Sequence, residues 1–104
     1  MHYKFVFYVP ESHVEPVKEA VFNAGAGKIG NYDCCSWQTM GQGQFRPLAG
    51  SQPFIGDTDR IEMVAEFRVE MICDAKFINE AVAALRRAHP YQEPAFDIWK
   101  LEIF

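Results

Sequence analysis

The stretch "GAGKIG", residues 25–30, decides between two folds, because its glycines fit the phosphate-binding fingerprint G-x-G-x-x-G. In that fingerprint a strand leads into the glycines and a helix leaves them, so that the helix N-terminus meets the phosphate. Here the predicted order is reversed, since a helix over residues 12–24 precedes the glycines and a strand over residues 32–40 follows them. The carbonyl end of a helix repels phosphate, so we interpret Gly25 as a helix stop and the other glycines as turn residues.

Two segments carry the apolar stripe of a helix with one buried side. The first, residues 12–24, begins with Ser12 and Glu15 at the spacing of a capping box. The second, residues 75–88, follows Asp74, which is a preferred helix cap. The stripes consist of Val14, Val17, Val21 and Ala24 in the first helix, and of Ile78, Ala81, Val82, Leu85 and Ala88 in the second.

Four segments have strand patterns, over residues 2–9, 32–40, 60–72 and 95–104. The first is apolar in both of its alternating sets, which is typical of a central strand. The order β-α-β-β-α-β is that of the split βαβ, or ferredoxin-like, plan. The sequence therefore predicts one α+β domain over residues 1–104, with a four-stranded antiparallel sheet and both helices on one face.

Composition excludes several classes of protein. The formal net charge is −4 and the longest basic cluster is the pair Arg86-Arg87, which argues against nucleic-acid binding. No apolar run approaches the ~20 residues of a membrane helix, and the N-terminal run ends at Pro10, too early for a signal peptide. Three cysteines, two of them adjacent, do not make a disulfide framework. We therefore expect a cytoplasmic protein with reduced thiols and no membrane partner.

Three blocks of sequence resemble one protein family: "GAGKIGNYDCCSW" (25–37), "GQGQFRPLAGSQPFIG" (41–56) and "AHPYQEPAFDI" (88–98). In this order and spacing they closely resemble the inserted domain of the NGG-interacting-factor-three-like proteins, also labelled type 2 GTP cyclohydrolase I-like. That domain is similar to CutA and to the PII signalling proteins, which have the ferredoxin-like plan and assemble as trimers. The resemblance implies a PII/CutA-like fold and a homo-oligomer, with the homotrimer first and the homodimer second.

The sequence also departs from that family. Full-length members carry a dinuclear metal centre of His, Asp and Glu residues in the domain that flanks this one, and the only histidines here are His2, His13 and His89. Gln92 stands where the family motif usually has a glutamate. The hydrolase-like metal chemistry of the family is therefore not carried over, and we expect an accessory domain by itself, more readily a non-catalytic protein than an enzyme.

The segment after the second helix groups polar side chains around two prolines: His89, Tyr91, Glu93 and Asp97. His89 and Glu93 can bind a divalent metal ion or a small ligand, and Cys35 completes a candidate metal set. The alternative for His89 is a rigid corner in which its ring bonds backbone groups. The alternative for Cys35 is a small core residue.

Residues 41–59 are rich in Gly, Pro, Gln, Ser and Asp, show no period, and occupy the position of the ligand-binding loop of PII proteins. Gly41, Gly43, Gly50 and Gly56 allow backbone N–H groups to form an anion nest, and Arg46 adds a planar charge for phosphate or carboxylate. The alternative is an arm that packs between subunits and buries Phe45, Pro47, Leu48, Pro53 and Phe54.

One face of the strand over residues 60–72 is strongly charged, with Glu62, Glu66, Arg68 and Glu70. We expect Tyr8 and Val64 to share this face. It is an acidic site, a solvated surface, or one side of an oligomer interface, for which an exposed aromatic residue is typical.

These observations predict a non-catalytic, oligomeric module that binds a small anion, a metal ion or a protein partner through residues 41–59 and the groove near His89. The alternative is a divalent-metal-binding protein or metal-dependent enzyme that uses His89, Glu93 and Cys35. A third hypothesis is a subunit that docks onto a separate metal-centre protein.

Overall fold

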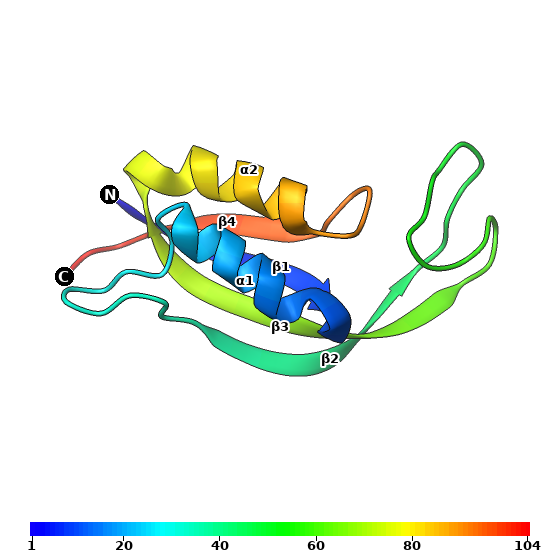
Figure 1. Cartoon of the computed structure of the whole chain (residues 1–104), viewed down its shortest axis with the longest axis horizontal. Coiled ribbons are helices and arrows are strands. Elements are labelled where there is room, and N and C mark those ends of the chain that lie inside the picture. The colour runs from blue at the N-terminus through cyan, green and yellow to red at the C-terminus, as the bar shows by residue number, and fades with distance from the viewer.

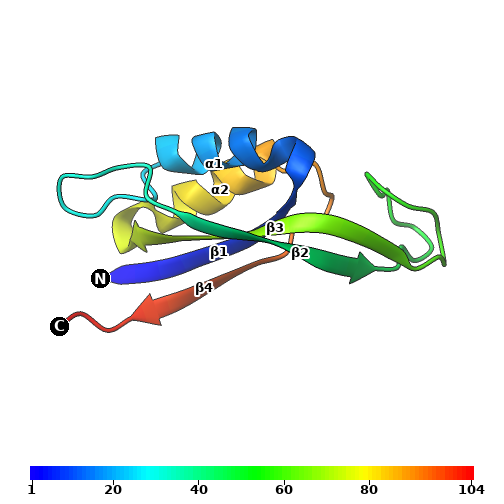
Figure 2. The same ribbon diagram turned by 90° about the horizontal axis from the view of Figure 1, so that it is seen from below.

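The first strand, β1 (His2–Pro10), lies inside a four-stranded antiparallel sheet with the strand order β2-β3-β1-β4. A computed structural model describes all 104 residues. The other strands are β2 (Trp37–Phe45), β3 (Glu62–Asp74) and β4 (Phe96–Leu101). The helices α1 (Val14–Asn23) and α2 (Ile78–Ala88) cover one face of the sheet (Figures 1 and 2). The predicted α+β, ferredoxin-like plan and the central place of the first strand are confirmed.

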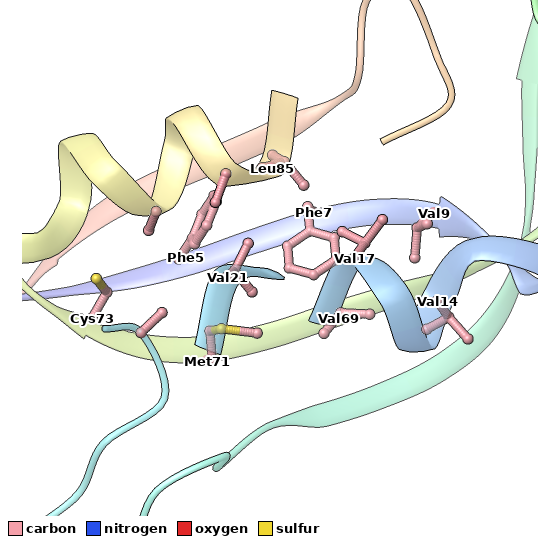
Figure 3. Packing of buried hydrophobic residues seen from close by; sticks show 13 residues of the cluster. Phe5, Phe7, Val9, Val14, Val17, Val21, Val69, Met71, Cys73 and Leu85 are labelled. Atoms are coloured by element: carbon pink, nitrogen blue, oxygen red, sulfur yellow. The ribbon is translucent and has the colours of Figure 1, made fainter. Parts of the chain in front are cut away.

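The core lies between the helices and the covered face of the sheet (Figure 3). Phe5 and Phe7 are fully buried, with ring centroids 5.6 Å apart. The remaining core side chains are mostly aliphatic: Val9, Val14, Val17, Val21, Ala26, Val69, Met71, Cys73, Ala81, Ala84 and Leu85. Burial of one large apolar side chain contributes about 1.5–3 kcal/mol, so this layer supplies most of the stability of the fold.

The glycine stretch after α1 is a helix stop and a turn, as interpreted from the sequence. Gly25 has a φ of +114°, and a Cβ there would lie 2.6 Å from Cγ of Phe77. The N–H of Gly27 donates to the carbonyl of Ile72 at 2.7 Å. The stretch therefore ends α1 and attaches the following chain to the end of β3, and only glycine fits its first position without strain.

Three local predictions can be compared with the structure. The capping box is wrong, because the Ser12 hydroxyl bonds Nδ1 of His13 at 2.8 Å and α1 begins after a short 3₁₀ turn over Glu11–His13. The Asp74 cap is confirmed, since its carboxylate accepts the N–H of Lys76 in the 3₁₀ turn that precedes α2. The second strand was placed too early, because β2 begins and ends five residues later than the predicted range 32–40.

Strands β2 and β3 extend beyond the rest of the sheet. Their pairing runs from Trp37 opposite Glu70 to Phe45 opposite Glu62, whereas β1 pairs with β3 only as far as Pro10 opposite Glu66. The extension makes the molecule elongated, with dimensions of 46 × 24 × 24 Å. We call this extension, together with the tip loop over residues 46–61, the hairpin end (Figure 1).

The two chain termini lie together at the opposite end (Figures 1 and 2). There His2 of β1 is the pairing partner of Leu101 of β4. Neither helix combines the length and the apolar character that a membrane crossing requires.

Candidate functional site

A cavity of about 290 Å³ lies at the hairpin end, between the tip loop and the corner that connects α2 to β4. Four aromatic residues contribute to its wall, namely Tyr8, Phe45, Phe54 and Tyr91. Two carboxylate side chains also line it, Glu66 from β3 and Glu93 from the corner. The cavity thus combines residues from β1, the β2–β3 hairpin and the corner, which are far apart in the sequence.

Contacts between the tip loop and the corner close the cavity. The N–H of Gln52 donates to Oε1 of Gln92 at 2.9 Å. The ring of Phe54 lies 6.2 Å from that of Tyr91 and meets the ring of His13 edge-on at 5.5 Å. Gln92, the residue that departs from the family motif, therefore supplies an amide oxygen that holds the tip loop in place.

His89 holds the corner through both of its ring nitrogens. Nδ1 accepts the N–H of Tyr91 at 3.1 Å, so Nε2 carries the proton and donates to the carbonyl of Tyr8 at 2.7 Å. The residue is only 6% exposed, and this burial lowers the pKa of His89 below its usual value. His89 is therefore a neutral positioning residue that sets Tyr91, whose ring centroid is 4.8 Å away, into the cavity wall.

The structure does not bring the candidate metal set together. The N–H of Cys35 donates to the carbonyl of Gly27, which is attached to Ile72 near the end of β3, whereas His89 bonds Tyr8 at the other end of the sheet. Cys35 is half-buried in a turn and is not part of the core, which corrects that alternative. No group of three or more His, Cys, Asp or Glu side chains is arranged to hold a metal ion.

The glycines of the predicted anion nest lie beside glutamates. Gly41 and Gly43 belong to β2 and not to a loop, which corrects the predicted boundary. A Cβ at Gly43 would collide with the carboxylate of Glu66, and one at Gly56 would collide with Cγ of Glu62. Two of these glycines thus provide space for acidic side chains, which is the opposite of an arrangement around an anion.

The charge of the cavity comes from its carboxylates alone. No lysine or arginine lines it. Arg46 is exposed outside the lining, and Arg68 donates to the carboxylate of Glu70 at 3.0 Å and to the hydroxyl of Tyr8, a lining residue, at 3.5 Å. Burial raises the pKa of Glu66, and burial together with the charge of Glu66 raises the pKa of Tyr91. The Tyr91 hydroxyl oxygen is buried and has no hydrogen-bond partner. The cavity is therefore acidic and aromatic, with one unused polar group.

The sequence predicted part of this site. It placed His89 and Glu93 at one corner, and the structure puts Glu93 in the cavity wall and His89 behind it. It placed Glu66 and Tyr8 on one charged strand face, but not in a cavity. One of the two alternatives assigned the aromatic residues of the loop to an arm that packs between subunits. Their contact with Tyr91 is tertiary and leaves no trace in local spacing.

The comparisons with known proteins place the chain in a family. No family model matches it. It is 52% identical over 98 residues to a GTP cyclohydrolase 1 type 2 homolog of Mycobacterium tuberculosis, covering 94% of this chain and 26% of that protein. The homolog of Bacillus subtilis is 40% identical over 99 residues, covering 95% of this chain and 26% of that protein. This chain is a domain of that family. It spans about a quarter of the length of the curated relatives that it matches.

Solved structures agree with this assignment. A Bacillus cereus protein related to NIF3 is 37% identical, with a TM-score of 0.84 over 98% of this chain and 26% of that one. CutA from Archaeoglobus fulgidus superposes with a TM-score of 0.71 at 15% identity, covering all of this chain and 87% of that one. The structure of the GlnK–ATP complex of B. subtilis superposes with a TM-score of 0.64 at 8% identity, covering 96% of this chain and 81% of that one. The last two likenesses concern the fold alone and confirm its PII/CutA-like character.

Proposed function

We propose that this domain is a non-catalytic, self-associating module that binds a small ligand in the cavity at the hairpin end. The volume of about 290 Å³ is near the lower bound, about 300 Å³, of pockets that hold small molecules. Its wall has the usual composition of such pockets, since it is mostly apolar with a few polar groups that can orient a ligand.

The observation that carries the proposal is the hydroxyl of Tyr91. This oxygen belongs to a residue of the cavity wall, is itself buried, and bonds nothing in the protein. Leaving a buried polar group unpaired costs about 1–3 kcal/mol, and native proteins avoid it unless a water or ligand supplies the partner. We expect a bound ligand to recover this energy through a shift of Tyr91 that turns its hydroxyl toward the cavity.

A binding role fits the cavity better than a catalytic one. General acid–base catalysis needs a group that can exchange a proton with the substrate. His89 has both ring nitrogens in backbone hydrogen bonds and stands behind Tyr91, outside the lining. Two carboxylates line the cavity and can exchange protons, but the lining hydroxyl of Ser51 donates to the carbonyl of Leu48 and is not paired with a base. The aromatic rings and amides that make up much of the wall suit recognition.

Self-association is proposed through the face of the sheet that the helices leave open. Trp37 pairs with Glu70 and Trp99 with Lys4, so both indoles lie on the face opposite to Phe5. Trp37 is 60% exposed and Trp99 46% exposed. Exposed aromatic residues are enriched at subunit interfaces. The resemblance to CutA and PII proteins supports a homotrimer first and a homodimer second.

The assembly is tested by sedimentation and native mass spectrometry of the untagged protein over a range of concentrations. We expect an oligomer that a Trp37→Ser, Trp99→Ser double variant converts to folded monomer, as checked by circular dichroism. A wild-type protein that is monomeric at every concentration contradicts the proposed self-association.

The binding role is tested with a thermal-shift screen of small cations, anions and neutral compounds. We expect at least one compound to raise the melting temperature of the wild type and to lose that effect in Phe54→Ala. Phe54 is 52% exposed, so this variant keeps the fold while it removes one cavity wall. A screen in which no compound of any charge binds contradicts the proposed role.

A further inference from the structure

We infer that the cavity at the hairpin end selects a small organic cation, an amine or ammonium group carried on an apolar or aromatic body. This inference rests on the proposed binding role of the cavity and names the class of ligand. Three independent features of the described residues support it: the sign of the charge, the arrangement of the rings, and the space reserved for one carboxylate.

The ionisable carboxyl groups of the lining are both acidic, and neither is paired with a cation. Glu66 and Glu93 line the cavity, and neither takes part in any of the ion pairs of the chain. Glu66 is half-buried, and a carboxylate partly removed from water is stabilised by a cation that pairs with it. A cationic ligand supplies that partner, whereas a phosphate or carboxylate ligand places a third negative charge beside the first two.

The aromatic residues form walls that suit a cation. The rings of Phe45 and Phe54 each lie 6.2 Å from that of Tyr91, both tilted by 47°. The π-faces of aromatic rings attract ammonium groups within about 6 Å, and several rings around one space are a recurrent means of binding them. The apolar edges of the same rings accept the body of the ligand.

The backbone of β2 leaves room for the carboxylate of Glu66. At Gly43 any Cβ would collide with Oε1 of Glu66, whereas a Cβ at Gly41 would come no nearer than 4.0 Å to the carbonyl of Glu66. The two glycines are two residues apart on the same strand and differ in this respect. A methyl group at Gly43 therefore displaces the carboxylate, and the same change at Gly41 is a matched control.

The test uses three soluble probes with one body and different charges: benzylamine, benzyl alcohol and benzoate. Binding at neutral pH is measured by NMR titration of amide resonances and by calorimetry. We expect benzylamine to bind at least about tenfold more tightly than the other two, as a charge-assisted contact requires. The shifted resonances should be those of the tip loop and the corner over residues 91–95.

Three single substitutions test which residues give the preference for benzylamine. Glu66→Gln keeps the shape of the side chain and removes its charge, so we expect it to lose most of the preference for benzylamine. Gly43→Ala should weaken benzylamine binding by about tenfold through the displaced carboxylate, and Gly41→Ala should leave it unchanged. Circular dichroism and melting temperature confirm that each variant is folded.

Different outcomes contradict the selection of a cation and the binding role of the cavity. Tighter binding of benzoate or benzyl alcohol overturns the selection of a cation while leaving the binding role in place. The inference is also wrong if benzylamine does not bind and the compounds found in the thermal-shift screen are anions or neutral molecules. The absence of any ligand in that screen contradicts the binding role itself.

Discussion

The two ends of strand β3 differ although one pattern runs through the whole strand. Apolar side chains alternate along it without a break, yet Val69 and Met71 are buried while Met63 is 53% exposed. The helices pack over Val69 and Met71 (Figure 3) and do not reach the hairpin end (Figure 2). Alternation therefore tells which face of a sheet a side chain occupies, and the covering layer decides whether it is buried.

The two ends of the molecule therefore contribute differently to its stability and to its candidate site. The covered end holds the core and supplies the stability. The hairpin end holds few fully buried side chains but brings carboxylates and aromatic rings around a cavity. Substitutions at the two ends should therefore have different consequences, and the four predictions below test that division from the largest effect to the smallest.

Substitution of two phenylalanines should give the largest difference in stability between the two ends. Phe7 is fully buried in the core, so Phe7→Ala should lower the free energy of unfolding by about 3–5 kcal/mol. Phe54 belongs to the cavity wall and is half exposed, so Phe54→Ala should cost less than about 1 kcal/mol. Urea denaturation followed by circular dichroism measures both values. Similar losses in the two variants would refute the division between a stabilising end and a binding end.

Two glycines with positive φ separate backbone strain from packing. Gly25 has a φ of +114° and Gly50 a φ of +92°, so an alanine is strained at both by about 1–2 kcal/mol. At Gly25 the new Cβ also collides with the ring of Phe77, whereas nothing lies within 4 Å at Gly50. We expect Gly25→Ala to lose about 2–4 kcal/mol and Gly50→Ala about 1 kcal/mol in the same denaturation experiment. Equal losses would mean that the Phe77 contact yields without cost.

His89 makes the stability of the corner depend on pH. Its pKa in the folded protein lies below the usual 6.5, so the unfolded chain binds the proton more readily. The stabilising effect is complete above pH 6.5 and should be lost as the pH falls through the lowered pKa. Glu66, whose pKa is raised, acts in the opposite direction.

The variant His89→Gln isolates this contribution, because Glu66 and the other titratable groups are the same in both proteins. We expect a loss of about 1–3 kcal/mol at pH 8, since a backbone group of Tyr8 or Tyr91 is left without a good partner. Melting temperatures between pH 5 and pH 8 should show a weaker acid dependence in the variant. Parallel curves would assign the acid dependence to other residues.

The cysteines test the burial of the core at the covered end by their reactivity. Cys34 is exposed, whereas Cys73 is buried at the covered end and its pKa is raised to about 11 by burial and by Asp74. A thiol reagent at pH 7 should label Cys34 within minutes and Cys73 only after unfolding. Peptide mapping by mass spectrometry distinguishes the sites, and labelling of Cys73 in the folded protein would show that the core opens.

Much of the fold could be predicted because its signals are local. The double apolar pattern of residues 2–9 indicated a central strand, and the helical stripes indicated one covered face. The boundary of β2 could not be predicted in this way. Gly41 and Gly43 are poor strand formers by themselves and enter the strand only because β3 supplies their pairing partners. The Ser12 cap failed for a similar reason, since a neighbouring His13 ring competes for the hydroxyl.

The candidate site was less predictable, because it exists only where three segments meet. The sequence shows acidic residues on one strand face, aromatic residues in a loop, and Tyr91 at a corner. Nothing in their spacing reveals that Phe45 and Phe54 approach Tyr91. The sequence analysis named Arg46 as a ligand-binding residue and did not name Glu66, whereas Glu66 lines the cavity and Arg46 does not.

The pairing of His2 with Leu101 has a practical consequence for protein engineering. Paired residues of neighbouring antiparallel strands are about 4.5–5.5 Å apart, a gap that a surface loop of a host protein can accept with little distortion. Spliced into such a loop, the domain would project outward along its 46 Å axis with the cavity at the far tip. The domain is therefore suited to insertion into a host protein as the binding domain of a sensor, in which a reporter at the base reads out binding at the tip.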